Sequence, residues 1–259
     1  MNVVVCVKQV PEVTDADLEI NKEGTEIDRE DLVMVINDWD NYAIEEAVLL
    51  QEKFGGTVTA VTIGTEEDED VLRRALAMGA DRAIRIDPGD VELDGFVISN
   101  LLSGAIKDLE YDLILTGVQA DDDNCGMVGI MLAEHLSLPH ASVVTAIEHK
   151  GEELKINVEL EDGLYEAAMI RLPSLLTIQT GINEPRYVSI MGIKKARKKE
   201  LTVLKVSDLN LSGEDLQVAT TVEEVYLPPE TEGAEIIKGD ASTVAGEIIR
   251  ILKEKGVNV

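Results

Sequence analysis

The chain has 259 residues, of which 45% are hydrophobic and only 3% aromatic, and its formal net charge at pH 7 is −28. This length suits one large or two modest domains with a substantial core built mainly from Val, Ile, Leu and Ala. The excess of 51 acidic over 23 basic residues argues against binding to nucleic acid, which requires neutralisation of phosphates, and against an anionic membrane surface.

Targeting and metal-binding signals are also missing from the sequence. There is no apolar stretch of 18 residues, and the N-terminal segment lacks the pattern of a signal peptide. The two cysteines, Cys6 and Cys125, fit neither a disulfide framework nor a metal cluster. The three histidines, His135, His140 and His149, lack the spacing of a zinc site. We therefore expect a cytoplasmic protein without a metal site.

Apolar runs alternate with helical patterns from the N-terminus to about residue 140. Continuous runs of aliphatic residues are typical of strands covered on both faces, and apolar residues at helical spacing predict the helices between them. The predicted strands are 3–8, 57–64, 83–86 and 111–117, and the predicted helices are 40–54, 65–78, 93–109 and 125–136. This alternation predicts an α/β fold with a doubly wound, mostly parallel, Rossmann-like sheet.

The pattern changes after residue 140. Short alternating segments separated by Gly-containing turns predict an antiparallel ribbon over 141–173, and 175–181 returns to a buried strand. Residues 201–240 show no regular pattern and cannot form a core alone, so they predict a linker or an arm on another protein. The last segment, 241–255, predicts an amphipathic helix. The expected organisation is an α/β domain over 1–185, a loop over 186–200 and an extended arm with a C-terminal helix over 201–259.

The loop at 117–129, GVQADDDNCGMVG, is the best candidate for a ligand site. Ligands of open parallel sheets bind at the carboxyl ends of strands, where the strand order reverses. Gly117 permits a tight turn, Asn124 is a predicted helix cap, and Gly126 and Gly129 permit close approach to the first helical turn. Free amides at such a turn form an anion site, so the sequence predicts a phosphate there.

Three consecutive carboxylates, Asp121, Asp122 and Asp123, complicate this interpretation. They would repel a phosphate unless they point elsewhere, cap amides, accept from ribose hydroxyls or hold a cation. The alternative is a solvated acidic turn before a helix. Nearby, the only tryptophan, Trp39, is either a packing residue or a cofactor platform. No glycine-rich phosphate motif and no hydrolase pattern is present, so no catalytic residue is predicted.

Residues 174–200 join a buried strand to an exposed basic segment, which suits presentation to a partner. The strand ends in a turn at 183–187, and the only concentrated basic run follows at 194–199. Three apolar residues, Ile190, Met191 and Ile193, lie between the turn and the run, and apolar residues bordered by charge are typical of a binding spot. The alternative is that these side chains are tucked against their own domain.

Several of these segments together resemble one known family. The stretch TGINEPRY at 180–187 with the following KKARKK, the segment ALAMGADR at 75–82 and the loop VQADDDNCGMVG resemble the beta (small) subunit of electron transfer flavoprotein. The resemblance covers the whole chain in order. Members of this family are heterodimers of alpha and beta subunits that carry electrons from dehydrogenases, acyl-CoA-type or other flavin enzymes, to a quinone reductase or another acceptor.

The resemblance implies two cofactor sites. One FAD is held mainly by the alpha subunit and faces the beta subunit, and an adenine nucleotide lies within the beta subunit. This nucleotide is AMP in conventional members and a second FAD in electron-bifurcating ones. The residues that the resemblance assigns to this nucleotide are Cys6, Asn37, Asp38, Trp39, Asp40, Ile63, Gly117, Val118, Gln119, Ala120, Asp121, Asp122, Asp123, Asn124, Cys125, Gly126, Met127 and Val128.

Departures from the family pattern bear on the identity of the nucleotide. Val128-Gly129, Asp40 and the Val7–Pro11 segment are closer to the bifurcating pattern, whereas Asn124-Cys125-Gly126 matches neither type. These features favour a second FAD, with AMP as the alternative.

The resemblance also assigns surfaces to partners. Ile190 stands where the family inserts an apolar anchor into a dehydrogenase, flanked by Met191 and Ile193. Arg186 is expected near the flavin or the subunit interface, with an ion pair that fixes the turn as the alternative. The arm and the last helix are expected to pack on the alpha subunit. The main alternative function is a stand-alone adenine-nucleotide-binding regulatory module, which would bind ATP without flavin.

Overall fold

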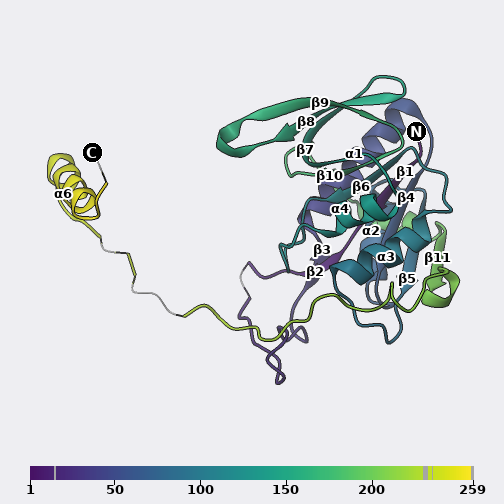
Figure 1. Ribbon diagram of the computed structural model, residues 1–259, viewed down its shortest axis with the longest axis horizontal. Helices are drawn as coiled ribbons and strands as arrows, with labels where there is room; N and C mark the ends of the chain where they lie inside the picture. Colours follow the sequence, from purple (N-terminus) through teal and green to yellow (C-terminus); the bar gives the residue numbers. More distant parts are fainter. Residues whose placement is uncertain (15, 230–232, 235, 258–259) are drawn as a thin grey trace. The chain divides into compact units, whose positions relative to one another are not determined.

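The computed structural model describes residues 1–14, 16–229, 233–234 and 236–257. The chain divides into two compact units, Met1–Glu224 and Val225–Val259. The larger unit holds the sheet and five of the six α-helices, and the smaller one holds helix α6 (Ala241–Glu254) (Figure 1). No helix within the described ranges is long and apolar enough to cross a membrane.

A nine-stranded sheet forms the centre of the larger unit, with the strand order β11-β5-β4-β1-β6-β10-β7-β8-β9. Its strands are β1 (Val3–Cys6), β4 (Val58–Ile63), β5 (Arg82–Asp87), β6 (Leu113–Gly117), β7 (His140–His149), β8 (Glu153–Glu159), β9 (Tyr165–Arg171), β10 (Ser174–Ile178) and β11 (Leu201–Lys205). A separate antiparallel pair joins β2 (Gln9–Pro11) to β3 (Met34–Ile36). The pairs from β11 to β7 are parallel, and β7, β8 and β9 form an antiparallel ribbon. The predicted mostly parallel sheet and the ribbon are therefore confirmed.

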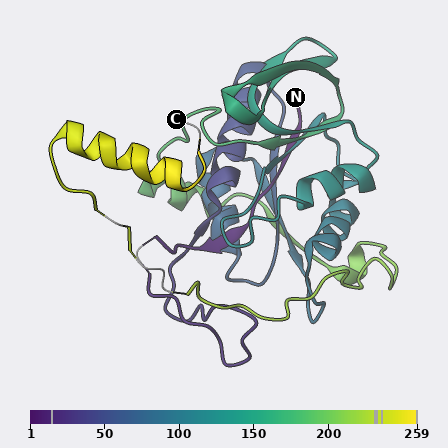
Figure 2. The ribbon, with the colours of Figure 1, turned by 60° about the vertical axis from the view of Figure 1, so that its left-hand side comes forward.

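Helices cover both faces of the sheet, as Figure 2 shows. They are α1 (Asp38–Phe54), α2 (Glu69–Met78), α3 (Gly95–Ile106), α4 (Val128–His135) and α5 (Ile190–Ala196). The first core cluster contains Ile44 of α1, Leu72 of α2 and Ala196 of α5. The second contains Leu101 of α3 and Leu132 of α4. Because every residue of β1 is buried, its apolar run is explained by this coverage on two sides.

The strand order reverses beside β1. The chain passes from β1 outward to β4 and β5, and then returns to place β6 on the opposite side of β1. The carboxyl ends of β1 and β6 therefore flank the switch point of the sheet, which is where doubly wound folds bind ligands.

The first part of the segment that was predicted as an arm belongs to the larger unit. Strand β11 pairs with β5, with Leu201 opposite Ala83, and Leu209 is buried against the second core cluster. Asp94, the N-cap of α3, accepts hydrogen bonds from the amides of Ala219 and Thr220 at 2.8 and 2.9 Å. The structure thus divides the chain at 224/225 rather than at 200/201. An edge strand held mainly by main-chain hydrogen bonds leaves little periodic pattern in the sequence, which explains the difference.

Candidate nucleotide-binding site

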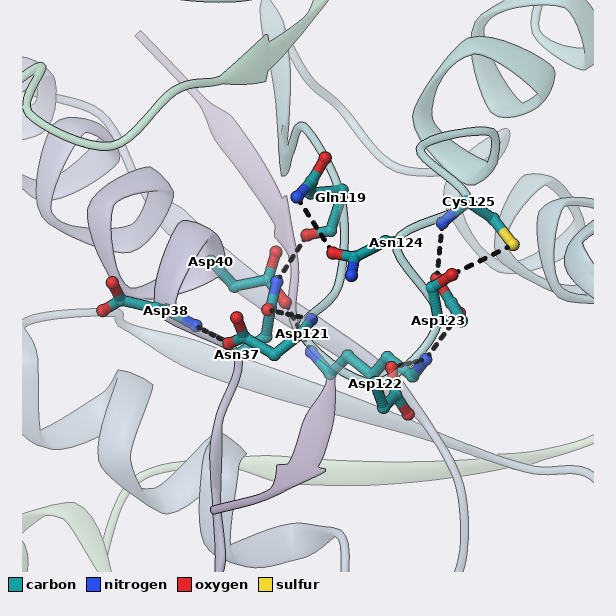
Figure 3. Close-up of polar contacts among 10 residues, drawn as sticks. Asn37, Asp38, Asp40, Gln119, Asp121, Asp122, Asp123, Asn124 and Cys125 are labelled. Carbon is teal, nitrogen blue, oxygen red and sulfur yellow. Dashed lines mark hydrogen bonds and ion pairs between the residues drawn. The ribbon is translucent and has the colours of Figure 1, made fainter. Parts of the chain in front are cut away.

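The loop between β6 and α4 lies directly against the first turn of α1 (Figure 3). Gly117 makes this approach possible. A Cβ atom at this position would lie 2.5 Å from Oδ1 of Asp40 and 2.7 Å from Cβ of Trp39. Only glycine therefore lets the end of β6 meet the start of α1.

Asn37 and Asp38 hold the backbone of the loop. The side chain of Asn37 is buried; its Nδ2 donates to the carbonyl of Gln119 at 2.8 Å, and its Oδ1 accepts from the amide of Asp121 at 3.1 Å. The amide of Asp38 donates to Oδ2 of Asp121 at 3.2 Å. These contacts direct the first of the three loop carboxylates towards α1, and the nearby charge of Asp121 adds to burial in raising the pKa of Asp38.

Asp40 bridges the switch point of the sheet. Its Oδ2 accepts from the amide of Lys8, just after β1, at 2.8 Å, and its Oδ1 accepts from the amide of Gly117, at the end of β6, at 2.9 Å. Asp40 is 5% exposed, and burial raises the pKa of its carboxyl group to about 7 although these hydrogen bonds favour the charged form. The same charge adds to burial in raising the pKa of the Cys6 thiol far above its usual range.

The other two loop carboxylates are also engaged within the chain. Nζ of Lys8 lies 2.6 Å from Oδ1 of Asp122 and 2.9 Å from Oδ2 of Asp123, and Oδ1 of Asp123 accepts from the amide of Cys125 at 2.9 Å. Two of the roles left open by the sequence are therefore present in the structure. Asp121 and Asp123 accept hydrogen bonds from backbone amides, and Asp122 and Asp123 pair with a cation, the ammonium group of Lys8. Among the described residues no group of three potential ligands could hold a metal ion.

Helix α4 begins later than predicted. Asn124 is not its cap, so that prediction is wrong. Asn124 adopts a left-handed conformation with φ 50°, and its Oδ1 accepts from Nε2 of Gln119 at 3.0 Å. A second left-handed residue, Gly126 with φ 61°, moves the start of the helix to Val128, after Met127, which makes no side-chain cap. Because Asn124 and Gly126 are left-handed, residues 125–127, which were predicted to be helical, lie outside α4.

The start of α4 is therefore open. Among the contacts of the described residues, the amides at 126–130 donate no hydrogen bond to the chain. Gly129 lets this turn pack on the sheet, since a Cβ there would lie 2.6 Å from Oγ1 of Thr116. Uncapped amides with the helix dipole behind them fit a phosphate group.

The remaining predicted residues lie around the same edge of the sheet. Cys6 ends β1 and is buried, Ile63 ends β4, and Cys125 is exposed. Nε1 of Trp39 donates to Oε1 of Gln179 at 2.9 Å, and Nε2 of Gln179 donates to Oε2 of Glu159 at 3.0 Å. The contacts of Gln179 and the role of Lys8 were not predicted from the sequence. The position of Lys8 at a strand end was its only signal.

The turn after β10 is fixed on α1. Arg186 lies 2.9 Å from Oε2 of Glu45, whose side chain is 4% exposed, and 2.8 Å from Oε1 of Glu52. These hydrogen bonds raise the pKa of the Arg186 guanidinium above its usual range. Nδ2 of Asn183 donates to Oε2 of Glu46 at 3.0 Å. The alternative expectation for Arg186, an ion pair that fixes the turn, is therefore confirmed. A contact of Arg186 with flavin or a partner stays a prediction.

Helix α5 follows this turn and presents apolar side chains. Met191 and Ile193 are 68% and 42% exposed, so they are not tucked against their own domain. Lys199 joins the end of this basic segment to α2, because its Nζ donates to the carbonyl of Leu76 at 2.9 Å. The side chain of Ile190 lies outside the described part of the structure, and its assignment as the anchor stays a prediction from the sequence.

Comparison with known proteins identifies the family. A family model described as "Electron transfer flavoprotein domain" matches residues 25–209. The chain is 40% identical to the electron transfer flavoprotein subunit beta of Bacillus subtilis, and the match covers 98% of both chains. It is 36% identical to the subunit of the same name from Methylophilus methylotrophus, again over 98% of both. It is 34% identical to the caffeyl-CoA reductase-Etf complex subunit CarD of Acetobacterium woodii, over 99% of this chain and all of that one. The chain therefore belongs to the electron transfer flavoprotein family, as one of its beta subunits.

Proposed function

We propose that this beta subunit works as half of a heterodimer with an alpha subunit, and that the pair carries electrons between a flavin dehydrogenase and a quinone reductase or another acceptor. Membership of the family supports this proposal. FAD, when bound, supplies the one- and two-electron chemistry. The chain's own residues bind, orient and surround the cofactors, as a carrier protein requires.

We infer further that this subunit binds an adenine nucleotide, AMP or a second FAD, in the loop at 117–128. The single observation that carries this inference is the open start of α4 beside the switch point of the sheet. The amides at 126–130 would take a phosphate, and Asn37 and Asp40 hold the loop in the conformation that presents them. Both ligands share the adenosine phosphate that such a site recognises.

Helix α5 and the basic run after it form the surface proposed for dehydrogenase recognition. Exposed Met191 and Ile193 supply apolar contact, and the exposed cations Lys194, Lys195, Arg197 and Lys198 suit an acidic partner. A relative named as part of a caffeyl-CoA reductase complex supports an acyl-CoA-type enzyme as the kind of partner.

The proposal is tested by the cofactor content of the purified two-subunit complex. The complex is denatured, and the FAD and AMP released per heterodimer are counted by chromatography. One FAD with one AMP indicates a conventional carrier, and two FAD molecules indicate a bifurcating one. A chain that stays monomeric or homodimeric in the presence of the alpha subunit and binds ATP without flavin would instead support the stand-alone regulatory module.

A further inference from the structure

The loop proposed to hold the nucleotide carries charge of the wrong sign for a phosphate. Asp121, Asp122 and Asp123 lie in the same loop, a few residues before the open amides at the start of α4, and Asp38 adds a fourth carboxylate beside Asp121. A bound phosphate is itself an anion, so it would be repelled by these side chains unless their charge is balanced.

One lysine from another part of the sheet meets two of these carboxylates. Nζ of Lys8 lies 2.6 Å from Asp122 and 2.9 Å from Asp123, and the side chain of Asp122 is 13% exposed. In the part of the chain that the structure describes, no other basic side chain pairs with either of them. Lys8 thus reaches across the switch point from the β1 side to the loop that follows β6.

The backbone of Lys8 is held on both sides, which fixes where its side chain starts. Its amide donates to Asp40 at 2.8 Å, and its carbonyl accepts from the amide of Asn37 at 2.9 Å. Burial disfavours the charged lysine, but the hydrogen bonds and charges of Asp122 and Asp123 outweigh burial and raise the pKa of Lys8. The lysine therefore stays protonated over the whole physiological pH range.

We propose that Lys8 is the counter-ion of the acidic loop, a positioning residue that balances Asp122 and Asp123 and so lets the loop accept a nucleotide phosphate. This inference rests on the proposed function, because it concerns the same nucleotide site. Lys8 acts through the two aspartates rather than by gripping the phosphate. The acidic loop is compatible with an anionic ligand only while this lysine is in place.

The experiment uses the two-subunit complex, stripped of nucleotide, and measures dissociation constants for AMP and for adenosine, which has the same base and ribose without the phosphate. Equilibrium dialysis with radiolabelled AMP and radiolabelled adenosine measures both constants. Lys8→Gln is expected to raise the dissociation constant for AMP roughly tenfold to a hundredfold at low salt, and less at high salt. The dissociation constant for adenosine is expected to stay unchanged. Lys8→Arg is expected to keep most of the affinity for AMP.

The decisive variant combines Lys8→Gln with Asp122→Asn and Asp123→Asn. If Lys8 serves to balance these carboxylates, the triple variant recovers most of the affinity for AMP that Lys8→Gln loses. A matched control is Lys53→Gln, which removes one positive charge from the last turn of α1, at the end of the helix opposite Asp40.

Each remaining outcome overturns the inference in a recognisable way. If the triple variant binds AMP as weakly as Lys8→Gln does, the lysine contacts the phosphate directly. If Lys8→Gln weakens adenosine binding as much as AMP binding, Lys8 only maintains the conformation of the loop. An equal effect of Lys53→Gln would mean that net charge alone matters. A wild-type complex that binds no AMP, and no FAD beyond the one held by the alpha subunit, would refute the proposed nucleotide site itself.

Discussion

The carboxylate of Asp40 and the amide of Gly117 are joined by a hydrogen bond of 2.9 Å between residues 77 positions apart in the chain. The same carboxylate accepts from the amide of Lys8. One buried side chain therefore ties α1 to the ends of both strands that flank the switch point.

Asp40 should make stability depend on pH. Its pKa is raised from 3.8 to about 7 in the folded chain, so folding favours its protonated form. The resulting contribution to stability is complete below about pH 4 and is lost as pH rises to about 7. The free energy of unfolding of the wild type, relative to Asp40→Asn, is expected to fall by up to about 4 kcal/mol over this interval. Urea titrations at pH 4.5, 6 and 7.5 measure it, and a constant difference would show that Asp40 is ionised throughout.

Gly117→Ala should disrupt the site locally. The added methyl group meets Asp40 and Trp39 at 2.5 and 2.7 Å, so the loop must move away from α1. A loss of about 1–3 kcal/mol in the free energy of unfolding is expected, together with reduced nucleotide content in the purified complex. Gly213→Ala is the matched control, because a Cβ there meets nothing within 4 Å. Equal effects of the two substitutions would contradict the close approach.

Arg186→Met should destabilise the turn after β10. It leaves the carboxylate of Glu45, which is 4% exposed, without its partner. Loss of one member of a buried pair is strongly destabilising, and because Arg186 itself is 32% exposed we expect about 2–3 kcal/mol. Thermal or urea unfolding checks this value. Arg250→Met, which breaks the exposed pairs of Arg250 with Glu247 and Glu254 on α6, is the control and is expected to leave the free energy of unfolding nearly unchanged, because solvent screens exposed ion pairs. A double-mutant cycle that combines Arg186→Met with Glu45→Gln measures the interaction energy of the Arg186–Glu45 pair.

Helix α5 should govern electron exchange with the partner enzyme. Ile190→Ala and Met191→Ala are each expected to slow electron exchange with a flavin dehydrogenase about tenfold or more at limiting concentrations, because apolar anchors dominate such interfaces. FAD and AMP contents should remain those of the wild type. Val33→Ala, at a residue that is 69% exposed elsewhere in the larger unit, serves as the control. Unchanged exchange in both α5 variants, followed by stopped-flow absorbance, would reject this surface.

The sequence predicted the elements whose signal is local. Apolar runs such as that of β1 and the period of α1 identify buried strands and helices without knowledge of their neighbours. The start of α4 was misplaced by three residues, because Asn124 and Gly126 take left-handed conformations that nothing in the local pattern specifies. Strand β11 was missed because its partner, β5, lies more than a hundred residues away.

The candidate site shows the same limit. Glycine positions and the acidic run of the loop could be found in the sequence, and so could the chemistry that they allow. Which partner each carboxylate takes could not be found, because Lys8 and Asp122 are 114 residues apart and meet only across the assembled sheet. A contact of this kind leaves no periodic signature in either segment.

The contacts of helix α1 bear on the order in which parts of the molecule fold. The 17 residues of α1 span about 25 Å, and the contact that fastens the turn at Arg186 joins residues 141 positions apart. Contacts so distant along the chain carry a large entropic cost of closure and are expected to form late. The surface proposed for dehydrogenase recognition should therefore form last during folding, after the sheet and helix α1 are in place.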